Sequence, residues 1–194
     1  MLNIILPIAA YLIGSISSAI IISKLYSLED PRNVGSGNPG ATNVLRSGNK
    51  TAAALTLVGD ILKGFLPLLA AKLFALSPTL IALTGLLAFL GHLYPIYYQF
   101  KGGKGVATAG GVLIGISPLV VLILIVIWLA SAFISRYSSL SALIAAIAAP
   151  ILIALIKPEL AYIILGVVIA IFLFWRHRAN IDRLLKGSET KISL

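Results

Sequence analysis

Apolar residues run through the chain in long blocks that short polar segments interrupt. Residues 3–26, 51–76 and 78–98 form the first three blocks, and each can cross a hydrocarbon core of about 30 Å as a helix rising about 1.5 Å per residue. Residues 104–135 are too long for one crossing, and Pro118 divides them into a short helix and a full-length one. The pattern therefore predicts helices that span a membrane.

Two further blocks, residues 138–156 and 160–176, complete the pattern, so the chain predicts seven crossings. The predicted fold is an all-α bundle that forms one domain over residues 1–194. Its fourth helix, residues 104–116, would be only about 18 to 20 Å long. We expect this helix to need a thinned bilayer or a buried position.

Composition supports an integral membrane protein, because 59% of the 194 residues are hydrophobic and only 11% are charged, against about 25% charged in soluble domains. The absence of cysteine excludes thiol chemistry, and two histidines and six carboxylates without ligand spacing predict no metal and no other cofactor. The net charge of +9 fits the positive-inside bias and anionic lipids better than nucleic acid.

The distribution of positive charge favours seven crossings over six. With seven crossings and the N-terminus outside, 12 of the 15 Lys and Arg residues are cytoplasmic, Lys72 and Lys157 lie outside, and Lys63 lies within the membrane. With six crossings, seven of these residues are cytoplasmic and seven lie outside, and Lys63 again lies within the membrane. The positive-inside rule thus predicts a cytoplasmic C-terminus and brings the polar motifs to the cytoplasmic face.

A polar, glycine-rich segment at residues 32–46 lies between the first two blocks. Gly35, Gly37 and Gly40 lack a Cβ, so backbone N–H groups can approach a ligand closely. Short donors and flanking arginines accompany the glycines, namely Ser36, Asn38, Thr42, Asn43, Arg32 and Arg46. We interpret the segment as an oxyanion site, because arginine can hold a phosphate in a fork. The alternative is a flexible linker.

Two more polar motifs lie on the same predicted face. Lys101, Gly102, Gly103 and Lys104 precede the short fourth helix, whose N-terminus can bind an anion; a basic turn for lipid headgroups is the alternative. The third motif follows the last block and contains His177, Arg178 and Asn180. These side chains can reach a polar substrate, although Arg-His-Arg is also an ordinary stop-transfer cluster.

Two polar features of the helices each leave two interpretations open. Asp60 and Lys63 lie three residues apart on one helix face, so they can serve function or simply tie helices together. Ser139 and Ser141 begin the sixth helix, where Ser138 or Ser139 is the expected N-cap and ligand hydroxyls are the alternative.

The three motifs resemble those of the bacterial acyl-phosphate:glycerol-3-phosphate acyltransferase (PlsY) family. The matching segments are residues 35–43, residues 91–95 with 101–108, and residues 177–181. The resemblance covers the whole chain and implies transfer of a fatty acyl group from acyl phosphate to the 1-hydroxyl of sn-glycerol 3-phosphate. The products would be lysophosphatidic acid and phosphate, in the first step of phospholipid synthesis.

The resemblance also implies site residues. Acyl phosphate would be held by Ser36, Gly37, Asn38, Gly40, Thr42 and Asn43, and glycerol 3-phosphate by Arg46, Lys104, His177 and Asn180. Lys101, Gly102 and Gly103 complete the second motif. A family serine near the start of the sixth helix falls on Ala142, so Ser139 and Ser141 are the candidates for that contact.

We expect acyl transfer without a covalent enzyme intermediate, because acyl phosphate is already activated and the chain has no cysteine and no Ser-His-Asp set. Asp60 and His177 are the plausible protein bases, while the resemblance suggests that the departing phosphate takes the proton. The implied partners are the two substrates, membrane lipids and a soluble enzyme that makes acyl phosphate. The implied location is the bacterial cytoplasmic membrane, with the site facing the cytoplasm.

Two other classes remain to be separated from the enzyme. A carrier for an anionic metabolite fits broken helices and intramembrane charge, but it would be expected to have paired inverted halves. A scaffold with a basic lipid-binding face does not need the Ser, Asn and Thr donors of the first motif.

Overall fold

The structure, a computed structural model, describes residues 1–192, in which all regular elements are helices. The first elements are α1 (Leu2–Gly14), α2 (Ser18–Leu25), α3 (Ala41–Leu45), α4 (Lys50–Leu73), α5 (Pro78–Leu93), the 3₁₀ turn η1 (Ile96–Tyr98) and α6 (Val106–Ile116). They are followed by α7 (Pro118–Ser135), α8 (Ser138–Ile156), α9 (Leu160–Arg176) and α10 (Arg178–Leu185). The chain divides into two compact units, Met1–Gly115 and Ile116–Leu194.

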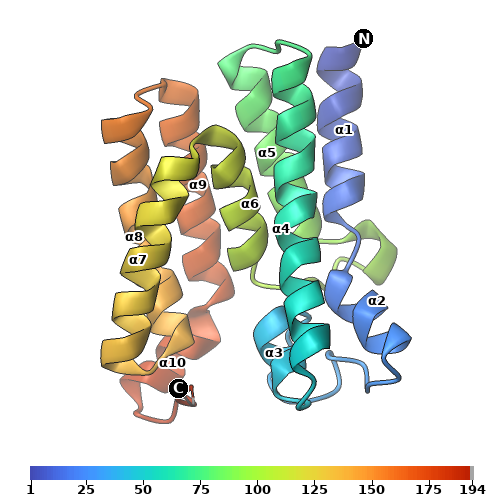
Figure 1. The fold of residues 1–194 in the computed structure, drawn as a ribbon, viewed down its shortest axis with the longest axis vertical. Helices are drawn as coiled ribbons and strands as arrows, with labels where there is room; N and C mark the ends of the chain where they lie inside the picture. The colour runs from blue at the N-terminus through green and yellow to red at the C-terminus, as the bar shows by residue number, and fades with distance from the viewer. Residues whose placement is uncertain (193–194) are drawn as a thin grey trace. The chain divides into compact units, whose positions relative to one another are not determined.

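In the first unit, α1 packs against both α4 and α5, and the short helices α2 and α3 pack against α4 (Figure 1). Small residues allow this close packing. A Cβ on Gly14 would collide with the backbone of Ala88 on α5, and a Cβ on Gly64 of α4 would collide with the carbonyl of Thr108 on α6. The glycines therefore let pairs of helices approach to backbone contact, as is common in membrane bundles.

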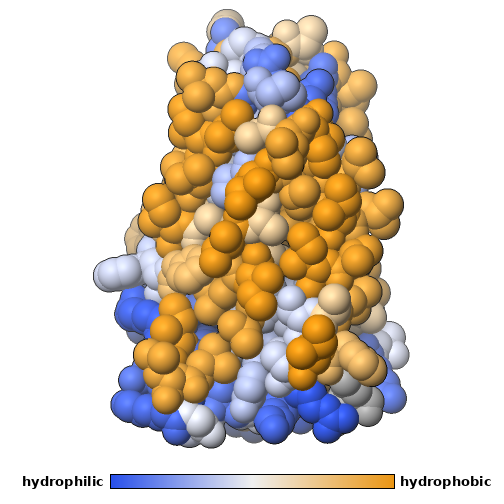
Figure 2. Space-filling view, turned by 90° about the vertical axis from the view of Figure 1, so that its left-hand side faces the viewer, coloured by the Kyte–Doolittle hydropathy of each residue, from blue (hydrophilic) through white to orange (hydrophobic). Residues whose placement is uncertain are grey.

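In the second unit, α8 packs against α7 and α9, and α10 contacts both α8 and α9 (Figure 1). Large apolar side chains on α7 are exposed, among them Leu122, Val126 and Phe133. On the face drawn in Figure 2, apolar residues cover the middle and hydrophilic residues gather at the ends. Such a band suits the hydrocarbon core of a bilayer.

The structure confirms the predicted bounds of the last three long helices, residues 118–135, 138–156 and 160–176. The prediction of one continuous helix over residues 3–26 is wrong, because α1 and α2 are separated and bent by 43°. Ser17 explains part of the break: it has extended backbone, and its side chain accepts the N–H of Ile20 as the N-cap of α2. The expected Ser138 or Ser139 cap of α8 is also wrong, since Tyr137 occupies the N-cap without a side-chain bond.

Within residues 1–192, four helices are long and apolar enough to cross a membrane, or up to six spans if each of two bent pairs is counted as one. The second bent pair is α9 with α10, at 59°. Helix α6 is apolar but has only 11 residues. The protein is therefore a multi-pass helical membrane protein, and the count of seven crossings stays a prediction.

Candidate functional site

The first glycine motif is built around the side chain of Asn43, which is 3% exposed. Its Nδ2 donates to the carbonyl oxygens of Pro31 at 2.7 Å and Val34 at 3.0 Å, and its Oδ1 accepts the N–H of Ser36 at 2.9 Å. These bonds use both ends of the carboxamide and fold the loop before α3 back onto that helix. The predicted substrate contact of Asn43 is untested, but its hydrogen bonds assign it first to loop structure.

Gly35 is required where the loop crosses Asn43. Its φ of +58° lies in the left-handed region, and a Cβ built on it would collide with Oδ1 of Asn43. The predicted donors around it have different exposures. Ser36, Gly37 and Thr42 are exposed, whereas Asn38 and Gly40 are half-buried. The loop thus presents hydroxyl and backbone groups at the surface of the first unit.

The two arginines that flank the motif are not equivalent. Arg32 is held by Asp30 through both carboxylate oxygens, with Nε 3.0 Å from Oδ1 and Nη2 2.6 Å from Oδ2. The side-chain hydrogen bond from Arg32 lowers the pKa of Asp30. Arg46 is exposed at the C-terminal end of α3. Of the two, Arg46 is the better placed for an incoming anion, and its predicted contact with glycerol 3-phosphate stays a prediction.

The second motif packs against the end of α5. The N–H of Gly103 donates to the carbonyl oxygen of His92 at 3.1 Å. A Cβ on Gly103 would collide with the His92 ring, and one on Gly102 would collide with the His92 carbonyl. Lys101 is exposed and Lys104 is half-buried. The glycines therefore allow close packing within the protein. From the sequence, we had interpreted them only as positions where a ligand approaches the backbone.

The first and second motifs meet at a small pocket in the first unit. The pocket is lined by Gly14, Ser15, Ile16, Ser17, Pro39, Lys63, His92, Pro95, Gly102 and Gly103. Pro39 belongs to the first motif, and Gly102 and Gly103 belong to the second. The structure thus brings together two polar segments that the sequence placed on one face.

A buried ion pair lies beside this pocket. Nζ of Lys63 is 2.8 Å from Oδ1 of Asp60, and the two side chains are 6% and 3% exposed. Nζ of Lys63 also donates to the carbonyl oxygen of Ile16 at 2.8 Å, and Nδ1 of His92 lies 3.6 Å from the Asp60 carboxylate. The pair joins α4 to α5 and to the break between α1 and α2. This geometry favours the helix-tying interpretation of Asp60 and Lys63.

The third motif lies in the second unit, where α9 ends and α10 begins. His177 is 3% exposed, and its Nδ1 is 2.8 Å from the carbonyl oxygen of Leu173. Because a carbonyl oxygen only accepts, Nδ1 carries a proton, and in the neutral ring Nε2 is the acceptor. Arg178 instead stacks on the ring of Trp175 at 4.8 Å. His177 is therefore oriented by its own helix.

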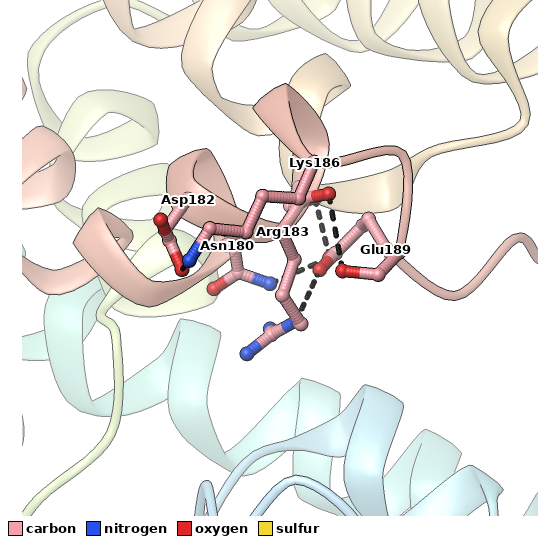
Figure 3. A network of polar contacts seen from close by, with 7 residues as sticks. Asn180, Asp182, Arg183, Lys186 and Glu189 are labelled. Carbon is pink, nitrogen blue, oxygen red and sulfur yellow. Dashed lines mark hydrogen bonds and ion pairs between the residues drawn. The ribbon is translucent and has the colours of Figure 1, made fainter.

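Asn180 and Ser139 are joined by a residue that sequence reasoning missed, Glu189. Nδ2 of Asn180 donates to Oε1 of Glu189 at 2.6 Å, and Oγ of Ser139 donates to the same oxygen at 2.7 Å. Ser141 is not part of this network, since its hydroxyl donates to the carbonyl oxygen of Tyr137 at 2.9 Å. Figure 3 shows Glu189 reaching back to α10. No sequence signal marks Glu189, which lies in a polar tail outside every motif.

Comparison with known proteins identifies the family. A family model described as glycerol-3-phosphate acyltransferase matches residues 4–187. A glycerol-3-phosphate acyltransferase of Thioalkalivibrio sulfidiphilus is 55% identical over 96% of this chain and 92% of its own length. One from Neisseria meningitidis serogroup B is 50% identical over 99% of this chain and 98% of its own. The chain belongs to the glycerol-3-phosphate acyltransferase family.

Solved structures of this family share the fold. The crystal structure of PlsY (YgiH), an integral membrane glycerol 3-phosphate acyltransferase, in its glycerol 3-phosphate form gives a TM-score of 0.93 at 43% identity, over 98% of this chain and 96% of that chain. Its lysophosphatidic acid form gives 0.92 at 41% identity, over 98% and 95%. The family predicted from the three motifs is thus confirmed. The roles of the individual site residues stay predictions.

Proposed function

We propose that this acyltransferase moves a fatty acyl group from acyl phosphate to the 1-hydroxyl of sn-glycerol 3-phosphate. The product is lysophosphatidic acid, and the reaction begins phospholipid synthesis. The observation that carries the proposal is full-length membership of a family whose solved member is described in a glycerol 3-phosphate form and a lysophosphatidic acid form. The acyl phosphate donor rests on the motif resemblance.

The proposed reaction is a direct displacement at the acyl carbon. The 1-hydroxyl oxygen bonds to the carbonyl carbon, the bond from that carbon to the phosphate oxygen breaks, and the hydroxyl proton leaves on phosphate. Acyl phosphate is a mixed anhydride with a good leaving group, so positioning and charge stabilisation can supply most of the catalysis. Exposed Ser36, Gly37 and Thr42 support acyl phosphate binding by the first motif. A stable acyl-enzyme after mixing with labelled acyl phosphate alone would contradict this mechanism.

Glycerol 3-phosphate is assigned to Arg46, Lys104, His177 and Asn180. The exposed guanidinium of Arg46 can form two hydrogen bonds to a phosphate. With Nδ1 bound to the Leu173 carbonyl, His177 can offer Nε2 either as a base or as a hydrogen-bonding group. His177→Ala and His177→Gln separate these roles: equal losses of about 10²-fold or more indicate a base, whereas substantial activity in the Gln variant indicates hydrogen bonding.

The deciding experiment uses purified protein in detergent with glycerol 3-phosphate and one acyl donor at a time. Lysophosphatidic acid formed from acyl phosphate, without a sealed compartment, supports the enzyme and excludes a carrier or a scaffold as the explanation. Product formed only from a thioester donor would contradict acyl phosphate as the donor. The protein would still be an acyltransferase. Hydrolysis of the product by a position-specific lipase then tests attachment at the 1-hydroxyl.

We also propose seven crossings in the bacterial cytoplasmic membrane, with the N-terminus outside and the C-terminus and site facing the cytoplasm. The charge distribution of the loops supports this topology. Because the chain has no native cysteine, single Lys50→Cys and Lys157→Cys variants can be labelled with a membrane-impermeant reagent. Seven crossings predict that residue 157 is labelled from outside and residue 50 only after permeabilisation. If α6 does not cross, both residues lie on the same side.

A further inference from the structure

The carboxylate of Glu189 is surrounded by three side-chain donors of the second unit. It accepts hydrogen bonds from Ser139 on α8 and from Asn180 on α10 through Oε1, and from Nε of Arg183 at 2.6 Å through Oε2 (Figure 3). The Glu189 side chain is only 7% exposed. Burial alone would raise the pKa of Glu189, but the bonds from Asn180, Ser139 and Arg183 outweigh burial and lower it. The residue is therefore a carboxylate at neutral pH.

The backbone on both sides of Glu189 is fixed. Gly187 has a φ of +68°, and the N–H groups of Gly187 and Ser188 donate to the carbonyl oxygens of Leu184 and Arg183 at 3.2 and 2.9 Å. This is the Schellman arrangement that ends a helix and reverses the chain. Further along, the N–H of Ile192 donates to the carbonyl oxygen of Arg136 at 2.8 Å. A segment held at both ends braces its neighbours and is poorly suited to leave when an anion arrives.

We propose that Glu189 is a positioning residue of the acyltransferase site, which fixes the orientation of the Asn180 carboxamide. Because a carboxylate only accepts, Oε1 of Glu189 selects Nδ2 of Asn180 and sets the direction in which Oδ1 points. The proposal rests on the proposed function, in which Asn180 contacts glycerol 3-phosphate. Glu189 itself acts through Asn180 and Ser139.

Two substitutions test this hydrogen-bond direction. In Glu189→Gln, the amide oxygen can still accept from Arg183, so the Gln NH₂ takes the place of Oε1 and faces Nδ2 of Asn180. Two donors then oppose each other, and Asn180 must flip or lose the bond. In the double variant Glu189→Gln/Asn180→Asp, the Gln NH₂ donates to the new carboxylate and an oxygen again points away from residue 189. The double variant also keeps the total charge.

The experiment measures kcat and KM for glycerol 3-phosphate, with the unfolding temperature of each variant in the same detergent. We expect Glu189→Gln to lower kcat/KM for glycerol 3-phosphate by about tenfold or more. Asn180→Asp alone should lose more, because two carboxylates then face each other. The double variant should recover at least about fivefold over the worse single variant, since a donor again faces an acceptor between residues 180 and 189, with the direction of the bond reversed. KM for acyl phosphate should change little.

Asp182→Asn is the matched control. Asp182 lies on the same helix and pairs with Lys186 at 3.0 Å, but both of these side chains are exposed, at 60% and 68%. This variant should keep wild-type kinetics. A wild-type protein without acyltransferase activity would refute the proposed function and not the geometry at Glu189.

Three outcomes would overturn the positioning role. Kinetic losses that merely follow a fall in unfolding temperature, with no recovery in the double variant, would assign Glu189 to stability alone. A lower KM for glycerol 3-phosphate in Glu189→Gln would show that the carboxylate competes with substrate. Wild-type kinetics in Glu189→Gln would remove Glu189 from the site.

Discussion

Replacing Lys63 by methionine should destabilise the first unit strongly, although the two side chains have similar length. The change leaves the Asp60 carboxylate buried without the ammonium group 2.8 Å away. It also removes the hydrogen bond that Nζ of Lys63 donates to the carbonyl oxygen of Ile16 at 2.8 Å. The only other cation-forming group in the described network is His92, whose Nδ1 is 3.6 Å from the carboxylate.

The size of the effect follows from two losses. Breaking a buried ion pair by removing one partner costs about 3–5 kcal/mol. Loss of the part-buried hydrogen bond to the Ile16 carbonyl oxygen adds about 0.5–1.5 kcal/mol. The sum, about 3.5–6.5 kcal/mol, corresponds to a fall in unfolding temperature of roughly 7 to 26 °C for a chain of this size. The double variant Asp60→Asn/Lys63→Met removes both charges, so it should be more stable than Lys63→Met by about 2 kcal/mol or more.

The assay is thermal unfolding in one detergent, followed by the fraction of protein that remains monodisperse after heating. Lys50→Met is the control, because Lys50 lies in the first turn of the same helix and is exposed; it should stay within about 0.5 kcal/mol of the wild type. A Lys63→Met protein as stable as this control would refute the reasoning. So would a double variant no more stable than the single one.

Other predictions concern the remaining polar contacts. Arg46→Ala and Lys104→Ala should each raise KM for glycerol 3-phosphate roughly tenfold or more, and their double variant should cost less than the sum if both hold one phosphate; near-wild-type kinetics in both single variants would remove them from the site. Asn43→Ala loses three hydrogen bonds, worth about 0.5–1.5 kcal/mol each. Its unfolding temperature should therefore be well below that of the control Asn33→Ala, in which the replaced residue is exposed. The pKa of Glu189 lies below its ordinary value of 4.5, so its stabilisation is complete above that pH and disappears as pH falls through the lowered pKa. The stability gap between wild type and Glu189→Gln should therefore narrow in acid, and an unchanged gap would contradict this.

The helices that the sequence predicted best are those whose ends are marked by proline or by a short polar break. Pro118 begins α7, Ser138 follows a short polar break, and Leu160 follows Lys-Pro-Glu, so the bounds of α7, α8 and α9 were all found. The break after α1 was missed because serines within an apolar run do not interrupt the hydrophobic pattern. The capping bond of Ser17 shows the break only when the backbone geometry is known.

Site prediction reached the motifs but not the partners of their side chains. The residues of the first motif were found from composition. The sequence does not show, however, whether an asparagine side chain contacts a ligand or, as Asn43 does, three groups of its own loop. The Ser139 to Glu189 bond joins positions 50 residues apart. Periodicity reports which face a residue occupies, and it carries no information on such pairings.

The return of the tail to α8 and α10 has a consequence for the order of events during synthesis. Residue 189 leaves the ribosome after residues 139 and 180, so the three-donor network cannot close while the membrane helices are being inserted. An interrupted chain that ends soon after α10 would contain every helix and all three motifs, and would insert normally. It would nevertheless lack the carboxylate that orients Asn180. The site would then reach its full activity only after residue 189 has left the ribosome, which is later than the insertion of the membrane helices.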